Sequence, residues 1–393
     1  MPDCENMMAF NRSIVDRRKP SPVGRRWKYR RSNLEQTLAC AISRLLPPIA
    51  LALVAVVGLR ASVHGAEREV LAWPPPYDYS GTPATISFKP IAKAERQWRI
   101  CASYPHLKDA YWISVNYGMV AQATAAGVRL TVVDAGGYPN VKRQREQIET
   151  CSHNADALIV GAVSYDGLSE VVRAIAARIP VIAAVNDMED AGLAAKVGIS
   201  WTEMGRIVGA YLASRHPTGG AAAKVAWFPG PSAAGWVKFI DAGFRAGLAG
   251  SAATISIVKW GDTGFDIQSR LVEETLESGP PVDYIVGSAV TADAAVSVLR
   301  ERRPDTSIKI FADYFTHGTY RAIKRGRLIA APTDSPVLQG RLAIDQAIRA
   351  LEQKLEHRHV GPSILLVYKS NVDRLDLDDS LAPGWFEPRF EVP

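Results

Sequence analysis

The sequence lacks the short motifs that mark many nucleotide-binding and catalytic sites. Gly230 and Gly235 have the spacing of a phosphate-binding loop, but Trp236 stands where that loop needs a lysine. No GxSxG nucleophile elbow and no CxxC or HExxH motif is present. The histidines form no recognisable triad pattern with a serine. These absences argue against a P-loop nucleotidase, a serine hydrolase and a zinc enzyme, so we expect no catalytic residue, no metal and no cofactor.

Cysteine is also scarce, with four residues in the whole chain. Two of them, Cys4 and Cys40, precede the part of the sequence that has the pattern of a folded domain. The other two, Cys101 and Cys151, fall in a predicted first strand and at the end of a predicted second helix. An oxidising compartment permits a bridge between them, but nothing in the sequence requires contact. We expect two buried free thiols, with a disulfide as the alternative.

Positive charge is concentrated near the start of the chain, so the formal net charge of +6 says little about the folded part. A basic cluster at 17–31 is followed by an apolar run at 45–59 and then by mostly small residues. This order is typical of a secretory leader, and the apolar run is short for a membrane span. We predict a leader at 1–66, cleaved near Gly65 or Ala66, and export to the periplasm. An uncleaved membrane anchor is the alternative.

A nucleic-acid partner is not expected. The basic cluster is followed directly by an apolar segment, which favours a leader over a nucleic-acid-binding arm. No helix-turn-helix segment precedes the first predicted strand, as it would in a two-lobed DNA-binding repressor. We expect contact with a membrane only through a partner protein.

Beyond residue 66 the chain alternates between predicted strands and helices. After a proline-rich lead-in, the first array has strands at 98–103, 128–133, 157–160 and 181–185 and helices at 111–126, 141–153 and 168–178. The pattern restarts after 196–201, with strands at 225–228, 254–258, 284–287 and 308–312 and helices at 202–215, 233–248, 266–278, 291–300 and 320–325. A late helix at 340–355 and a late strand at 363–368 follow. Continuous apolar strands between amphipathic helices indicate parallel sheets that are covered on both faces.

This order predicts an α/β protein with two doubly wound parallel-sheet domains, joined by a hinge that the chain crosses more than once. The predicted parts are a leader at 1–66, an extended lead-in at 67–97, a first lobe at 98–200 plus 334–359, a second lobe at 201–333 plus 360–370, and a tail at 371–393. A ligand site is expected between the lobes, at the carboxyl ends of the strands.

Aromatic rings and carboxylates recur in the loops that follow the predicted strands. The candidate ligand-binding residues are Asp109, Tyr111, Trp112, Tyr138, Trp201, Trp236, Asp313 and Tyr314. Ring faces attract methylated cationic nitrogen, while indole N–H and phenol O–H groups can donate hydrogen bonds. The alternative is that the rings belong to the core, where large aromatic side chains are common. Asn186, Asp187 and Asp262 also follow strands.

Several segments resemble a known family. They are Pro105-His-Leu-Lys-Asp-Ala-Tyr-Trp112, Ala135-Gly-Gly-Tyr-Pro-Asn140, Lys142-Arg-Gln-Arg-Glu-Gln147, Asp283-Tyr-Ile-Val-Gly-Ser-Ala-Val290 and Ala331-Pro-Thr-Asp334. Over about residues 97–370 the chain resembles the type I periplasmic binding proteins, the ribose- and galactose-binding class. More specifically it resembles the periplasmic trimethylamine N-oxide sensors of the TorT type.

The resemblance implies a non-catalytic protein that closes around trimethylamine N-oxide. It also implies a partner, the periplasmic domain of a membrane histidine kinase. Carried over by motif, the ligand cage comprises Tyr111, Trp112, Tyr138, Trp201 and Tyr314, with Asp109 as a carboxylate of the cleft. Asp313 falls where the wider class places a ligand-binding residue. Trp236 has no expected family counterpart, a departure that can shift ligand choice towards another methylated amine.

Two other functions stay open at this point. The first is delivery of a sugar or a quaternary amine to an ABC transporter, although sugar sites need many hydrogen-bonding side chains and these loops are short of arginine. The second and less favoured is a secreted enzyme that uses Asp109 or Asp313.

Overall fold

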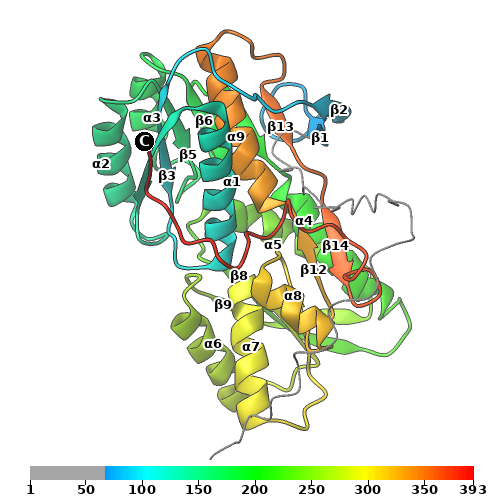
Figure 1. The fold of residues 1–393 in the computed structure, drawn as a ribbon. Coiled ribbons are helices and arrows are strands. Elements are labelled where there is room, and N and C mark those ends of the chain that lie inside the picture. Colours follow the sequence, from blue (N-terminus) through cyan, green and yellow to red (C-terminus); the bar gives the residue numbers. More distant parts are fainter. Residues whose placement is uncertain (1–66) are drawn as a thin grey trace, which may run out of the picture. The chain divides into compact units, whose positions relative to one another are not determined.

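The computed structural model describes residues 67–393, so the predicted leader lies outside the described residues (Figure 1). Nine strands form the larger sheet, in the order β15-β4-β3-β5-β6-β7-β13-β1-β2. Their bounds are β1 Arg68–Ala72, β2 Ala84–Phe88, β3 Arg99–Tyr104, β4 Arg129–Asp134, β5 Ala157–Val160, β6 Val181–Val185, β7 Ala195–Gly198, β13 His359–Gly361 and β15 Glu391–Val392. The strands from β4 to β13 run parallel, whereas β1, β2 and β15 are antiparallel additions at the two edges.

A second sheet of four parallel strands has the order β11-β10-β8-β9. Its strands are β8 Ala223–Gly230, β9 Ala253–Trp260, β10 Tyr284–Gly287 and β11 Lys309–Ala312. A two-stranded antiparallel sheet joins β12 Ala330–Thr333 to β14 Leu365–Tyr368. The two parallel sheets confirm the predicted α/β class. The strand interiors carry apolar residues on both faces, because helices cover both faces and separate apolar clusters pack against them.

The helices match the predicted ones within a few residues at each end. They are α1 Ala110–Ala126, α2 Val141–Ser152, α3 Ser169–Ala176, α4 Trp201–Ser214, α5 Gly235–Leu248, α6 Phe265–Ser278, α7 Ala289–Arg302, α8 His317–Lys324 and α9 Pro336–Leu351. The largest differences are at α8, which begins three residues before the predicted helix, and at α9, which begins and ends four residues before it. Proline at the first position of α9 suits a helix start, because proline has no N–H to leave unpaired.

Helix α9 packs against α1 beside the larger sheet, although it follows the second sheet in the sequence (Figure 1). Glycines allow the two backbones to approach closely. A Cβ atom at Gly118 would lie 2.0 Å from the Val337 carbonyl oxygen, and one at Gly340 would lie 2.2 Å from the Val115 carbonyl oxygen. The chain therefore returns to the first lobe after building the second. Because the two backbones are so close at these glycines, larger side chains there should force the helices apart.

The segment after β14 is packed rather than a free polar tail. Val372, Ser380 and Ala382 are buried, and β15 pairs with β4 at the edge of the larger sheet. The Ala382 carbonyl oxygen lies 2.7 Å from His317 Nε2.

 The Ala382 N–H donates to the Ser114 hydroxyl oxygen at 3.2 Å. Because Ser114 belongs to α1 and His317 to α8, the C-terminal segment contacts helices of both lobes.

The lead-in adds two strands, β1 and β2, to the edge of the larger sheet. Strand β1 pairs with β13 and β2 pairs with β1, both antiparallel. Val70 and Phe88 are buried and belong to the core of the first lobe. The lead-in therefore has no core of its own and is stabilised by the lobe that it joins.

The expectation of two free thiols was wrong, because Cys101 and Cys151 form a disulfide. Their Cα atoms lie 6.2 Å apart, although 50 positions separate them in the sequence. Cys101 is in β3 and Cys151 is in the last turn of α2, which packs on that strand. The bridge fits export to an oxidising compartment.

The disulfide predicts a specific loss of stability on reduction. Closing a loop of this length should stabilise the folded chain by about 4 kcal/mol, mainly by restricting the unfolded chain. We expect urea unfolding of the oxidised protein to need more denaturant than unfolding after reduction and alkylation. A non-reduced digest should contain one cross-linked peptide pair with Cys101 and Cys151. Two thiols that alkylate without reduction would contradict the bridge.

Candidate functional site

The loop between β3 and α1 positions the first group of site residues. Asp109 is the N-cap of α1, and its Oδ1 accepts hydrogen bonds from the backbone N–H groups of Tyr111 and Trp112, each at 3.1 Å. The cap satisfies two N–H groups that the first turn would otherwise leave unpaired. It also places Tyr111 and Trp112 on that turn, where both rings are buried.

The loop after β4 brings in Tyr138. The preceding Gly136 and Gly137 have φ values of 81° and 148°, a region that disfavours residues with a Cβ atom. A Cβ atom at Gly137 would also lie 3.2 Å from Asp262 Oδ2 of the second lobe. The Gly-Gly-Tyr sequence therefore combines a tight turn, a close approach between the lobes and a ring that faces the cavity.

Nine residues line a cavity between the two parallel sheets, with about 260 Å³ of space between their atoms. They are Asp109, Tyr111, Trp112, Tyr138, Asn186, Trp201, Trp236, Thr263 and Tyr314. All of the predicted site residues except Asp313 are among them. Little free space remains among these side chains, so the cavity suits only a ligand of few heavy atoms.

The rings of the cavity contact one another across the two lobes. Trp236, in the first turn of α5, lies 5.2 Å from Trp201, 6.1 Å from Tyr138 and 6.2 Å from Tyr314 between ring centroids. Tyr111 lies 5.2 Å from Tyr314 in an edge-on arrangement. These distances are typical of favourable aromatic pairs. The rings thus form a cage whose walls come from segments far apart in the sequence.

Asn186 was noticed in the sequence as a loop residue but was not predicted to belong to the site. Its Nδ2 donates to the Tyr138 hydroxyl at 3.2 Å and to the Ala162 carbonyl oxygen at 2.8 Å. The preceding Val185 has a φ of 69°, which is rare for a β-branched residue. The Trp201 indole N–H donates to the Val185 carbonyl oxygen at 3.0 Å. Strained backbone of this kind is most common at functional sites.

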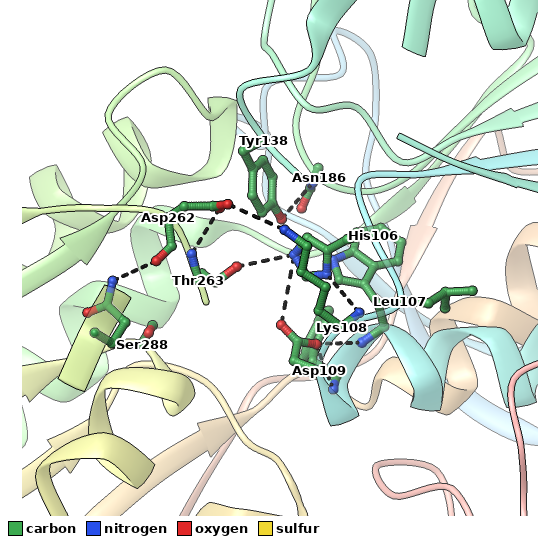
Figure 2. Close-up of polar contacts among 12 residues, drawn as sticks. His106, Leu107, Lys108, Asp109, Tyr138, Asn186, Asp262, Thr263 and Ser288 are labelled. Atoms are coloured by element: carbon green, nitrogen blue, oxygen red, sulfur yellow. Dashed lines mark hydrogen bonds and ion pairs between the residues drawn. The ribbon is translucent and has the colours of Figure 1, made fainter. Parts of the chain in front are cut away.

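Polar contacts join the two lobes next to the cavity (Figure 2). His106 Nε2 lies 3.1 Å from Thr263 Oγ1, and Lys108 Nζ lies 3.7 Å from Asp262 Oδ2. The Gln268 side chain donates to the Asp262 carbonyl oxygen at 2.9 Å and holds that loop in place. His106 and Thr263 are both buried. The sequence showed His106 only as a loop histidine, and nothing in it singled out Thr263.

Tyr111 links the cavity to the crossover between the lobes. Its hydroxyl donates to Asp334 Oδ2 at 2.6 Å, and the Gln339 amide donates to the same oxygen at 2.8 Å. Asp334 follows β12 directly, and burial raises the pKa of its carboxyl group to about 6 while both hydrogen bonds oppose that rise. Burial raises the pKa of the Tyr111 hydroxyl as well, and the neighbouring Asp334 adds to that effect.

Asp313 does not line the cavity, so the structure does not bring it together with the other predicted site residues. Its side chain is fully buried behind Tyr314, and neither carboxyl oxygen has a hydrogen-bond partner in the described part of the chain. Burial raises the pKa of this carboxyl well above its usual range. A ligand role for Asp313 therefore stays a prediction, because its side chain does not line the cavity.

Two negative findings apply to residues 67–393. No group of three or more His, Cys, Asp or Glu side chains within that range could hold a metal ion. No helix there is long and apolar enough to cross a membrane.

Two α/β lobes that meet around a small aromatic cavity define a two-lobed ligand-binding protein. A family model described as a periplasmic binding protein domain matches residues 100–355. Periplasmic protein TorT of Escherichia coli K12 is 39% identical over 308 residues, which cover 77% of this chain and 87% of TorT. The chain therefore belongs to the periplasmic binding proteins, and within them to the TorT type.

Solved structures support the same family. An ABC transporter solute-binding protein from Bradyrhizobium sp. BTAi1, with bound Bis-Tris, is 42% identical with a TM-score of 0.70, covering 82% of this chain and 97% of that one. TorT in complex with the TorS sensor domain in the presence of TMAO is 37% identical with a TM-score of 0.68, covering 75% and 99%. The related proteins are periplasmic binding proteins, and this family membership indicates a periplasmic location.

The link between Tyr111 and Asp334 predicts a pH-dependent effect on stability. Tyr111→Phe should lower the free energy of unfolding by roughly 1.5–3 kcal/mol at pH 8, where Asp334 is ionised and loses a charge-assisted hydrogen bond. The loss should be smaller at pH 5, below the folded pKa of about 6, where the carboxyl is mostly protonated. The sign follows because the hydrogen bond from Tyr111 lowers the pKa of Asp334, so it stabilises the ionised carboxyl more than the protonated one, and its loss costs more above a pH of about 6. Burial alone acts in the opposite direction, because it raises this pKa and lowers stability as the pH rises through about 6.

Urea unfolding at both pH values in the absence of ligand measures the effect. Tyr104→Phe is the matched control, because the buried Tyr104 hydroxyl contacts Met119 Sδ and the Asn116 amide and no carboxylate. Its penalty should not differ between the two pH values. An equal penalty for Tyr111→Phe at pH 5 and pH 8 would show that Asp334 does not control the effect.

Proposed function

We propose that this protein is a periplasmic sensor that closes on trimethylamine N-oxide, or on a closely related methylated amine, and signals to the periplasmic domain of a membrane histidine kinase. In this role it has no catalytic activity and uses no cofactor or metal. The observation that carries the proposal is the cage of Tyr111, Trp112, Tyr138, Trp201, Trp236 and Tyr314 around a small cavity that also contains the Asp109 carboxylate.

The cage has the chemistry to recognise a methylated nitrogen with a formal positive charge. Ring faces attract such a group by roughly 0.5–2 kcal/mol for each good contact. Asp109 adds a negative charge whose Oδ1 is held by the helix cap. Its Oδ2 lies 3.9 Å from His106 Nε2, beyond hydrogen-bond distance. We propose that this second oxygen attracts the methylated nitrogen.

The size of the cavity favours a methylated amine over a sugar. Sugars need a larger site with many hydrogen-bonding groups, whereas this wall has six aromatic rings and no arginine or lysine. The cage is also assembled from both lobes, so a ligand that contacts both of them stabilises the closed form. A kinase domain that prefers one form would detect the ligand through this shift.

The partner and ligand are supported by a relative. A TorT of 37% identity forms a complex with the TorS sensor domain in the presence of TMAO. We infer the same kind of partner here. We also infer that residues 1–66 export the chain, a segment that lies outside the described residues.

A second candidate is delivery of a small amine to an ABC transporter. The similar Bradyrhizobium protein, a transporter solute-binding protein with bound Bis-Tris, is the observation that favours it. The two functions share the site and differ in ligand and partner.

Thermal shift with trimethylamine N-oxide, glycine betaine, choline and ribose tests the proposal. The N-oxide must be kept at low millimolar concentration or less, because it stabilises proteins non-specifically at high concentration. A saturable rise with the N-oxide alone would support the sensor. A rise with betaine or choline alone would favour uptake, and a rise with ribose alone would refute the ligand assignment.

Asp109→Asn gives a sharper test of the site. Asparagine is also a good N-cap, so α1 should keep its start while the cavity loses its negative charge. We expect binding to weaken about tenfold or more, measured by calorimetry. Asp190→Asn is the matched control, because Asp190 Oδ1 likewise accepts from the N–H groups two and three residues later and does not line the cavity. Equal binding by both variants would exclude Asp109 from the site.

A further inference from the structure

Trp236 is a cavity residue with a buried polar group that has no hydrogen-bond partner among residues 67–393. It is 2% exposed, and its indole nitrogen is buried without a hydrogen bond to any residue of 67–393. The preceding Gly235 fixes its position, because a Cβ atom there would lie 2.5 Å from the Asp187 carbonyl oxygen of the first lobe. A buried N–H without an acceptor is costly, and such groups are rare in folded proteins.

Two other donors in the wall already have acceptors. The Trp201 indole N–H donates to the Val185 carbonyl oxygen at 3.0 Å, and the Tyr111 hydroxyl donates to Asp334 at 2.6 Å. The Tyr138 hydroxyl accepts from Asn186, which leaves its own hydrogen available. Trp236 lies beside this hydroxyl, with 6.1 Å between the ring centroids. The indole N–H and the phenol O–H therefore form a pair of donors at one side of the cage.

We propose that the indole N–H of Trp236, assisted by the Tyr138 hydroxyl, donates a hydrogen bond to the oxygen of the ligand. The inference rests on the proposed function and adds the group that recognises the oxygen of the ligand. The site would then select methylated amines with an oxygen acceptor close to the nitrogen, such as an N-oxide. Tetramethylammonium has a similar size and ring-binding surface but no acceptor, so it would leave the N–H unpaired.

The position of Trp236 gives this hydrogen bond a second consequence. Asp109 starts α1 beside the larger sheet, whereas Trp236 lies in α5, which follows β8 of the second sheet. The methylated nitrogen contacts the carboxylate from the first lobe, and the oxygen contacts the indole from the second. A ligand with both groups bridges the lobes and favours closure. A ligand without the oxygen lacks this link.

Calorimetry with trimethylamine N-oxide and tetramethylammonium on the full exported chain tests the inference. Trp236→Phe keeps an aromatic ring and removes the N–H. It should weaken N-oxide binding roughly tenfold to a hundredfold, as expected for a buried hydrogen bond to a charged oxygen, and change tetramethylammonium binding less than about threefold. Trp201→Phe is the matched control, because its N–H already bonds to Val185 and its loss should affect both ligands alike.

A measurement on the unmutated chain keeps the test valid if Trp236→Phe fails to fold. The indole ¹⁵N–H signal of Trp236, assigned through its contacts with Tyr138, should move downfield with the N-oxide and much less with tetramethylammonium. Equal shifts with both ligands would overturn this inference and leave the proposed function standing. A Trp236→Phe variant that weakens the binding of both ligands equally, or of neither, would do the same. If the unmutated protein binds neither methylated compound, the proposed function fails and this inference fails with it.

Discussion

The rest of the site depends on one side chain, Asp109, which has two physical roles. One carboxyl oxygen caps α1 by accepting two backbone hydrogen bonds, and this cap fixes the directions of Tyr111 and Trp112. The Asp109 side chain also lines the cavity, where its carboxyl group lies among aromatic rings. The helix start and the candidate site are therefore the same local structure. A change that moved the cap would also move two rings of the cage and the hydrogen bond from Tyr111 to Asp334.

The cage is completed by contacts between residues that no local rule brings together. Tyr138 and Trp236 lie 6.1 Å apart between ring centroids, and His106 meets Thr263 across the lobes. Each lobe alone would leave these rings and polar groups exposed to water. Their burial therefore favours the closed arrangement, while the unpartnered indole N–H of Trp236 opposes it until an acceptor is present. Under the proposed function, such a balance would make closure sensitive to a small ligand, because an acceptor on the ligand would turn the unfavourable contribution of this N–H into a favourable one.

Much of the fold was predictable because parallel strands buried on both faces are continuous apolar runs, and the helices between them are amphipathic. Strands β5, β6 and β10 have the bounds that the sequence predicts. Strand β7 was missed as a strand, because its four residues include Lys196, which is buried with Asp187 as its partner. The disulfide was missed because strand and helix patterns do not specify which face of α2 meets β3.

The sequence by itself determined the class of fold and most of the cage, because loops at the carboxyl ends of parallel strands meet at one edge, and their aromatic residues can be read directly. Only the tertiary structure decided that Asn186 and Thr263 join the cavity, that Asp313 is buried without lining it, and that the last residues return to β4. These outcomes depend on how the two lobes meet. That geometry arises from many weak contacts between distant segments, and no single segment of the sequence encodes it.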